Sequence, residues 1–157
     1  MLSIGPANPP VDLDLPAGDW RRVAIFMNVF DVHVNRAPVS GMVTATSYHK
    51  GAFVNASLDK AAEANERQNI CMETDTGHKI GIVQIAGLVA RRTLLETGVG
   101  DRLLVGKQCG ISRFGSRVDV WLPASTPVTV LPGQRTIAGE TVIADLDAVR
   151  RETSDKR

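Results

Sequence analysis

Aromatic residues, cysteines and long apolar runs are all scarce in this chain of 157 residues. Aromatic side chains make up only 4% of the composition, so Val, Ile, Leu and Ala must fill the core. Two cysteines are too few for a disulfide framework, which favours a reduced, cytosolic setting. No stretch approaches the roughly 20 apolar residues of a membrane-spanning helix, and the first residues lack a signal-peptide pattern. These absences predict one soluble globular domain.

An excess of charge of either sign is also missing. Lys and Arg total 18 and Asp and Glu total 17, so the net charge of +1 gives no electrostatic reason to expect a nucleic-acid partner. The cysteines, Cys71 and Cys109, and the histidines, His33, His49 and His78, lack metal-ligand spacing, so no metal site is expected. His49 and His78 each precede a lysine in a predicted turn and are expected to be solvated.

Short β-prone segments separated by Gly and Pro dominate the chain. Strands are predicted within residues 23–34 (one bent strand or two), 42–48, 69–74, 79–89, 98–106, 117–122 and 128–142, with a hairpin turn at Thr76-Gly77. Residues 56–67 are rich in Ala and Glu and predict one short helix, which the cluster Asn65-Glu66-Arg67 is expected to end at the surface. The predicted fold class is mainly β, with two packed sheets and one short helix.

Three parts are expected along the chain. Residues 1–19 are rich in Pro and Gly and predict an N-terminal arm, and residues 20–149 have the length of one domain. Residues 150–157 are charged and predict a disordered tail. The chain contains no internal repeat, so one domain between two peripheral segments is the expected organisation.

The pair Gly115-Ser116 lies just before the alternating residues 117–122. A serine hydroxyl that follows a glycine can attack the carbonyl of that glycine, because glycine has no Cβ to block the approach and tolerates strained backbone. The peptide then becomes an ester, and elimination with hydrolysis leaves a pyruvoyl group on the new N-terminus. The nucleophile-elbow pattern of serine hydrolases is absent around Ser116. A Gly-Ser pair also occurs by chance in most proteins, so the pair alone leaves both interpretations open.

His33 is the second candidate residue. On a strand it shares one face with Asp31 and Asn35, and a histidine beside a carboxylate and an amide can be held in the single tautomer that acid–base catalysis needs. The alternative is a solvated polar face on a half-buried strand. The segment alone does not decide between these two interpretations.

Five segments together resemble one known family. They are IFMNVFDVHVNRAPVSG, KGAFVNASLDKAAEANER, VQIAGLVARR, RFGSRVDVWLP and IAGETVIA. The series resembles the phosphatidylserine decarboxylase family, in its short bacterial and archaeal type, over about residues 23–144. The resemblance implies a barrel-sandwich-like arrangement of the two predicted sheets.

The resemblance also implies a proenzyme that cuts itself between Gly115 and Ser116. Residues 1–115 would form the β chain and residues 116–157 the α chain, and Ser116 would become a covalent pyruvoyl cofactor. The pyruvoyl carbonyl would condense with the substrate amine, and decarboxylation of phosphatidylserine would give phosphatidylethanolamine. His33 matches the histidine of the family motif and is assigned acid–base work.

Supporting residues and partners follow from the same resemblance. Asp31, Asn35 and Arg36 are candidate supporting residues, and Arg36 stands where larger members carry a second histidine. The partners that the resemblance implies are a phospholipid substrate, the membrane surface and the other chain of the cut proenzyme. A homodimer is a separate expectation, because the edges of a truncated β domain need covering. The implied location is peripheral, on the cytoplasmic face of the cell membrane.

Two departures from the family pattern are expected to matter. Ser112 stands where relatives have an apolar residue. Family members also begin with a hydrophobic anchor and a Ser-Pro-Ala-Asp-Gly-like stretch, whose aspartate is thought to orient the histidine, and Met1 falls after both. An N-terminal truncation is the favoured explanation, with a strand supplied by a partner or impaired self-cleavage as the others.

Two other functions stay open. One is decarboxylation of a related serine phospholipid, such as an archaeal ether lipid. The other is a non-catalytic lipid-surface module that keeps the fold but does not process itself. Self-cleavage distinguishes the enzyme from the module.

Overall fold

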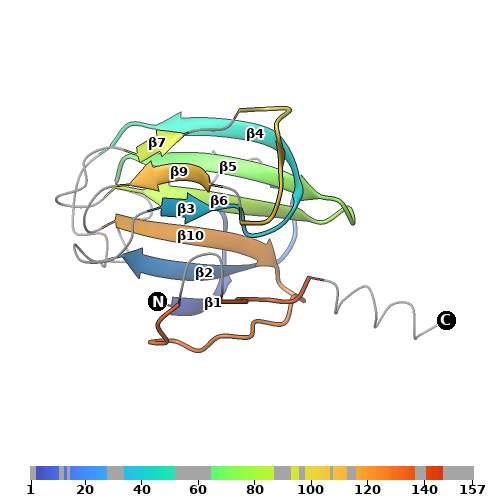
Figure 1. The fold of residues 1–157 in the computed structure, drawn as a ribbon. Helices are drawn as coiled ribbons and strands as arrows, with labels where there is room; N and C mark the ends of the chain where they lie inside the picture. The colour runs from blue at the N-terminus through green and yellow to red at the C-terminus, as the bar shows by residue number, and fades with distance from the viewer. Residues whose placement is uncertain are drawn as a thin grey trace.

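A computed structural model describes residues 3–10, 13, 15–27, 34–51, 65–86, 93–95, 98–106, 108–112, 116–136 and 141–146. Within these ranges the regular structure consists of strands, and no helix is present (Figure 1). The strands are β1 (Ser3–Ala7), β2 (Trp20–Met27), β3 (Val34–Arg36), β4 (Gly41–His49), β5 (Arg67–Thr74), β6 (Lys79–Ile85), β7 (Thr93–Leu95), β8 (Arg102–Leu103), β9 (Gln108–Ser112) and β10 (Ser116–Pro123). The mainly β prediction is confirmed.

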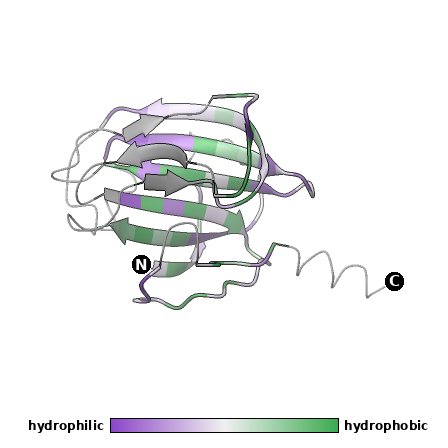
Figure 2. Cartoon of the chain, viewed as in Figure 1, coloured by the Kyte–Doolittle hydropathy of each residue, from purple (hydrophilic) through white to green (hydrophobic). Residues whose placement is uncertain are grey.

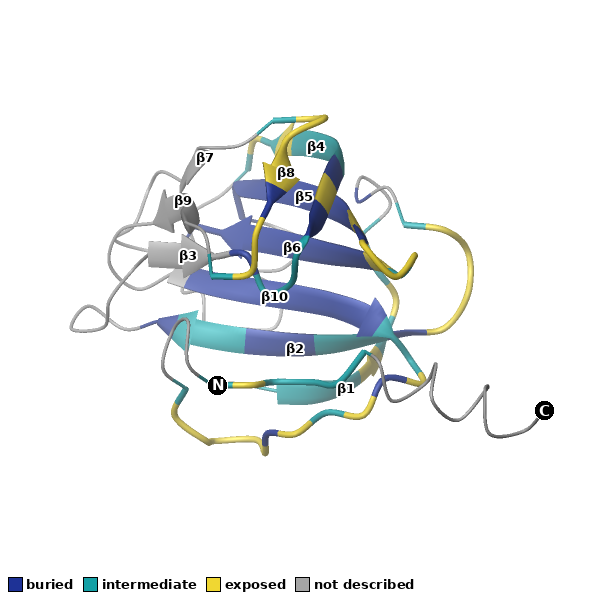
Figure 3. Cartoon of the chain, turned by 45° about the vertical axis from the view of Figure 1, so that its right-hand side comes forward, coloured by how far each residue is buried: buried dark blue, intermediate teal, exposed yellow. Residues whose placement is uncertain are grey.

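The strands form two antiparallel sheets. The large sheet has seven strands in the order β1-β2-β10-β6-β5-β4-β8, and the small sheet has three in the order β3-β9-β7. β10 lies inside the large sheet, where it pairs with β2 on one side and with β6 on the other. Figure 3 shows the neighbouring strands β10, β6 and β5 as the most buried part of this sheet.

Each face of the large sheet carries its own buried cluster, because side chains alternate along every strand. We call the face with Val118, Val120 and Leu122 of β10 the Val118 face. Strand pairing places Val23, Ile82 and Ile70 of the neighbouring strands on the same face, in the same cluster. The Trp121 face carries a smaller cluster: Leu13, Trp20, Cys71, Val83, Ile85 and Trp121. Aliphatic residues thus fill most of the larger core, as the low aromatic content predicts.

Different segments cover the two faces. Leu13 packs so tightly on the Trp121 face that a Cβ on Gly81 would lie 2.8 Å from its Cδ2 atom, which explains the glycine in β6. On the opposite side, Ala37 directly follows β3 and is buried in the cluster of the Val118 face. Figure 1 draws the small sheet on one side of the large sheet, and β7 contacts β5. The small sheet therefore lies on the Val118 side.

Several sequence predictions can be checked strand by strand. Residues 23–34 contribute to two strands, β2 and β3, which belong to different sheets. The hairpin turn is confirmed: Gly77 has a φ of 87° and its N–H donates to the Thr74 carbonyl. Between residues 128 and 146 the described part contains a single bridge, Val128 to Ala144, so the strands predicted at 128–142 are wrong there. Within the predicted arm, β1 pairs with β2.

The predicted helix has a wrong C-terminal boundary. Residues 52–64 lie outside the described residues, but Arg67 is the first residue of β5. Asn65, Glu66 and Arg67 were expected at the surface, and all three are buried. Their polar side chains favour a surface position locally, whereas the pairing of Arg67 with Ile85 and the hydrogen bonds between residues 65–66 and Ala86 place all three against the end of β6.

Candidate functional site

Ser116 is the first residue of β10, and its Cα pairs with that of Met27 at the end of β2. We call this the Ser116 end of the large sheet, and the opposite end, where Trp20 begins β2 and Pro123 ends β10, the Pro123 end. By strand alternation, position 116 belongs to the Val118 face. Gly115, the other residue of the predicted cleavage site, lies outside the described residues.

The small sheet is connected to the Ser116 end by short segments. Residues 113–115 alone separate β9 from β10, so the Cα atoms of Ser112 and Ser116 are at most ~15 Å apart. Residues 28–33 separate Met27 from β3. Val34 of β3 pairs with Ile111 of β9, so both segments run between the same two sheets.

His33 and Asp31 lie outside the described residues, and their roles stay predictions. Asn35 and Arg36 belong to β3, where Asn35 pairs with Gly110 and the register shifts before Arg36. β3, which begins directly after His33, lies on the Val118 side of the large sheet. Position 116 belongs to the Val118 face, so β3 and position 116 are on the same side of that sheet. This backbone arrangement is compatible with the predicted pairing of histidine and serine.

A buried ion pair fixes the residue that follows Ser116. The Arg117 Nε and Nη2 atoms donate to the two carboxylate oxygens of Asp119 at 2.7 and 2.8 Å. The two side chains are only 1% and 2% exposed. They share the Trp121 face, two residues apart on one strand. A forked arginine–carboxylate pair fixes both orientation and distance, so it holds the beginning of β10 in a defined geometry.

The residues before β5 fasten the end of β6 at the same end of the sheet. The Asn65 side-chain amide donates to the Ala86 carbonyl at 2.6 Å, and the Ala86 N–H donates to the Glu66 carbonyl at 2.9 Å. Asn65 is fully buried. The cluster predicted to end a surface helix therefore closes a buried corner of the sheet.

Two glutamines face each other on the Val118 face, next to the Ser116 position. Gln84 of β6 pairs with Val118 of β10 on one side and with Gln68 of β5 on the other. Gln68 is bonded: its Nε2 donates to the Ser47 carbonyl at 2.9 Å. Gln84 is fully buried, yet neither its Nε2 nor its Oε1 has a hydrogen-bond partner among the described residues. An unpaired buried polar group costs about 1–3 kcal/mol, so Gln84 lowers stability where it stands.

Hydrophilic residues thus gather at the Ser116 end. Figure 2 shows hydrophilic colour at the beginning of β5, and in the first half of β10 hydrophilic and hydrophobic colours alternate. The described polar residues there include buried charged and amide side chains: Asn65, Glu66, Arg67, Gln68, Asn69, Gln84, Arg117 and Asp119. No local sequence signal marks Gln84, because a lone glutamine in a strand is usually a surface residue.

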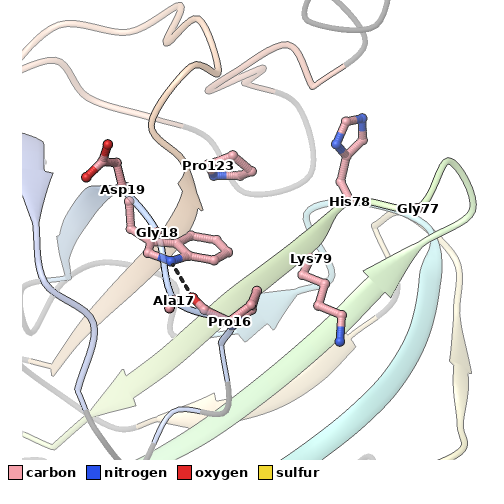
Figure 4. Close-up of a pocket in the computed structure, with 9 residues that line it drawn as sticks. Pro16, Ala17, Gly18, Asp19, Gly77, His78, Lys79 and Pro123 are labelled. Carbon is pink, nitrogen blue, oxygen red and sulfur yellow. Dashed lines mark hydrogen bonds between the residues drawn. The ribbon is translucent and has the colours of Figure 1, made fainter.

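A shallow pocket of about 310 Å³ lies at the Pro123 end. Residues 16–20, 77–79 and 123 line it, and the Trp20 Nε1 donates to the Pro16 carbonyl at 3.0 Å (Figure 4). His78, predicted to be solvated, is half-buried at its rim, and His49 is half-buried at the end of β4. Pro123 is seven residues from Ser116 along β10, about 23 Å, so this pocket is separate from the candidate site.

Comparison with known proteins decides the family. The family model described as phosphatidylserine decarboxylase matches residues 13–144, a range that includes Gly115, Ser116 and His33. The chain belongs to the phosphatidylserine decarboxylase family. The matched range also contains every strand of the large sheet except β1, so family membership extends over most of the described fold.

Relatives named phosphatidylserine decarboxylase proenzyme are about half identical to the chain. The protein of Saccharopolyspora erythraea is 52% identical over 140 residues, which are 89% of this chain and 59% of the relative. The protein of Xanthobacter autotrophicus is 52% identical over 152 residues, which are 96% of this chain and 65% of the relative. The protein of Rickettsia felis is 51% identical over 149 residues, which are 95% of this chain and 64% of the relative. The chain thus spans less than two thirds of these relatives. No solved structure matches it.

The word proenzyme in the relatives' names describes a precursor, in agreement with the processing implied by the sequence. Within the described ranges, no helix has the length and apolar character needed to cross a bilayer. Among the same residues, the one cysteine whose side chain is described, Cys71, is buried.

Proposed function

We propose that the chain is a self-cleaving decarboxylase that converts phosphatidylserine to phosphatidylethanolamine. The observation that carries the proposal is the family match across Gly115-Ser116, together with the position of Ser116 as the first residue of an interior strand. The substrate is lipid, so the Ser116 end would work at a membrane surface, with the protein peripheral to the cytoplasmic face of the cell membrane.

Self-cleavage would proceed without an external reagent other than water. The Ser116 hydroxyl oxygen bonds to the Gly115 carbonyl carbon, the C–N bond breaks and the serine nitrogen takes a proton. Elimination then breaks the Cβ–O bond and releases Gly115 as a free carboxylate. Hydrolysis of the remaining enamine releases ammonia and leaves a pyruvoyl group at position 116. His33 is proposed to take the hydroxyl proton, with Asp31, Asn35 and Arg36 as supporting residues.

The described residues fit a group formed at this position. The amide of Arg117 would carry it, and the Arg117–Asp119 pair would hold that residue in place after the cut. β10 pairs with β2 over eight residues and with β6 over five, and both neighbours belong to the fragment 1–115. The α and β chains would therefore stay together in one sheet. The pyruvoyl group would supply an electrophilic carbonyl for the substrate amine and an electron sink when carbon dioxide leaves.

A homodimer remains part of the proposal as a prediction. The outermost strands of the large sheet are β1, with five residues, and β8, with two. Short edge strands offer little backbone for pairing, so a dimer would have to use β1 or a face formed by side chains.

The intact mass of the purified protein tests self-cleavage. Two fragments that end and begin at Gly115 and Ser116, the smaller without a free N-terminal amine, are expected for the wild type. Ser116→Ala should give one uncut chain, and His33→Ala should give one uncut chain that keeps the wild-type circular dichroism spectrum. Release of carbon dioxide from phosphatidylserine vesicles then tests the activity.

Two results would contradict these assignments. Normal cutting in Ser116→Ala would exclude this serine as the nucleophile, and normal cutting in His33→Ala would restrict His33 to decarboxylation or remove it from the mechanism. A wild-type chain that stays uncut would favour the non-catalytic lipid-surface module.

A further inference from the structure

Gln84 is the one described side chain near Ser116 that is completely buried and has both amide atoms without a hydrogen-bond partner among the described residues. Folding alone does not explain this residue, since a leucine or methionine would fill similar space without an unpaired donor and acceptor. A ligand that satisfies both atoms would explain it.

The register places Gln84 within reach of the predicted reaction centre. Gln84 pairs directly with Val118, which is two residues from Ser116 on the same face of β10. Position 116 is therefore a diagonal neighbour of Gln84, and such neighbours lie about 7–8 Å apart between Cα atoms, which a long side chain can span. The Gln84 amide thus belongs to the sheet surface on which the proposed pyruvoyl group would be formed.

The chemistry of the two atoms selects the ligand group. The Nε2 donates and the Oε1 accepts, so the matching ligand carries an acceptor and a donor side by side. The amino-carboxylate end of a serine head group has this pair, whereas a phosphodiester offers only acceptors and would leave the Oε1 atom unpaired. The substrate amine must also reach position 116, which brings its neighbouring carboxylate to the same place.

A neutral amide also suits the loss of carbon dioxide. An arginine bonded to the substrate carboxylate would stabilise the charged ground state strongly, and that stabilisation would be lost as the carboxylate becomes neutral carbon dioxide. A neutral donor orients the carboxylate and lowers the ground-state energy less. On the described Val118 face the register places the neutral Gln84, with its unpaired donor, beside Val118, while the charges of Arg117 and Asp119 belong to the opposite face.

We propose that Gln84 binds the amino-carboxylate end of the serine head group, with its Nε2 donating to the carboxylate and its Oε1 accepting from the amino group. The proposal rests on the proposed function, because it takes position 116 as the reaction centre. It makes Gln84 the residue that distinguishes a serine from an ethanolamine head group.

The test compares Gln84→Leu with Gln68→Leu in the full 157-residue chain. Both changes replace an amide on the Val118 face by an apolar group, but only Gln68 has a bonded amide, to the Ser47 carbonyl. Without ligand, Gln84→Leu should unfold at the wild-type temperature or above it, because an unpaired amide is removed. Gln68→Leu should unfold at a lower temperature, because a hydrogen bond is lost.

Binding is then measured from the shift in unfolding temperature with two soluble probes, glycerophosphoserine and glycerophosphoethanolamine, with Ser116→Ala added to every protein so that no pyruvoyl group forms and the serine probe is not consumed. The wild type and Gln68→Leu should bind the serine probe more tightly than the ethanolamine probe. In Gln84→Leu the affinity for the serine probe should fall about 10- to 100-fold, the loss expected for a hydrogen bond to a charged group, and the preference should disappear.

An unchanged preference in Gln84→Leu, or no preference in the wild type, would overturn the assignment of Gln84. These outcomes are independent of the proposed function, which fails if the wild-type chain neither cuts itself nor releases carbon dioxide. A chain that binds the serine probe through Gln84 but stays uncut would separate head-group recognition from catalysis.

Discussion

At the Pro123 end of the large sheet, Trp20 and Trp121 pack with aliphatic side chains, whereas at the Ser116 end Arg117, Asp119 and Gln84 are buried. The first end gains stability from apolar burial. The second buries charge and an unpaired amide, which stabilise a fold less than apolar residues of the same size would. Polar residues that lower stability are expected at functional sites, and the predicted cleavage site lies at this same end of the sheet.

The largest effect should come from the ion pair at the Ser116 end. Asp119→Ala leaves the Arg117 guanidinium buried beside an empty carboxylate position, and such changes cost about 3–5 kcal/mol of unfolding free energy. Self-cleavage should also slow, because Arg117 follows the scissile bond. Urea denaturation and a time course of intact mass measure the two effects. A loss of stability below about 1 kcal/mol would show that the pair does not hold β10.

Trp20→Ala is the matching change at the Pro123 end. Removal of this buried side chain should cost about 3 kcal/mol, the lower end of the range for Trp, because the side chain borders an open pocket. Cleavage at Ser116 should keep its wild-type rate in all molecules that remain folded. Trp20→Phe keeps a ring and loses the bond to the Pro16 carbonyl, at a cost of about 1 kcal/mol. If the folded fraction of Trp20→Ala cut itself more slowly than the wild type, cleavage at Ser116 would depend on packing at the Pro123 end, and the two ends would not be independent.

The smallest effect is expected for an exposed pair beyond the Pro123 end. The hydrogen bonds from Arg102 at 2.8 Å hold the pKa of Asp75 below its ordinary value of 3.8. A lowered folded-state pKa gives stability that is present above pH 3.8 and is lost as the pH falls below it. Solvent screens this pair, so Arg102→Ala should change the unfolding temperature least of the three. A shift at pH 7 as large as that of Asp119→Ala would contradict this ranking.

The contrast between the two ends also separates what sequence could predict from what it could not. β10 and the turn at Thr76-Gly77 follow from local signals, namely alternation and a left-handed glycine. The burial of Asn65 and Arg67 depends on which strands become neighbours, and the local composition instead indicates a surface helix. Gly115-Ser116 becomes a predicted cleavage site through the family resemblance of the surrounding segments, which needs no structure, whereas Gln84 becomes notable only when the register pairs it with Val118.

β10 lies between β2 and β6, so the proposed cut at Ser116 would change the molecularity of folding. Before the cut, one chain closes the sheet by an intramolecular step. Afterwards the strand that completes the sheet is on a separate peptide, and unfolding becomes dissociation, with a midpoint that rises with protein concentration. At low concentration the separated fragments would meet too rarely to reassemble, so the mature protein would depend on slow unfolding to persist.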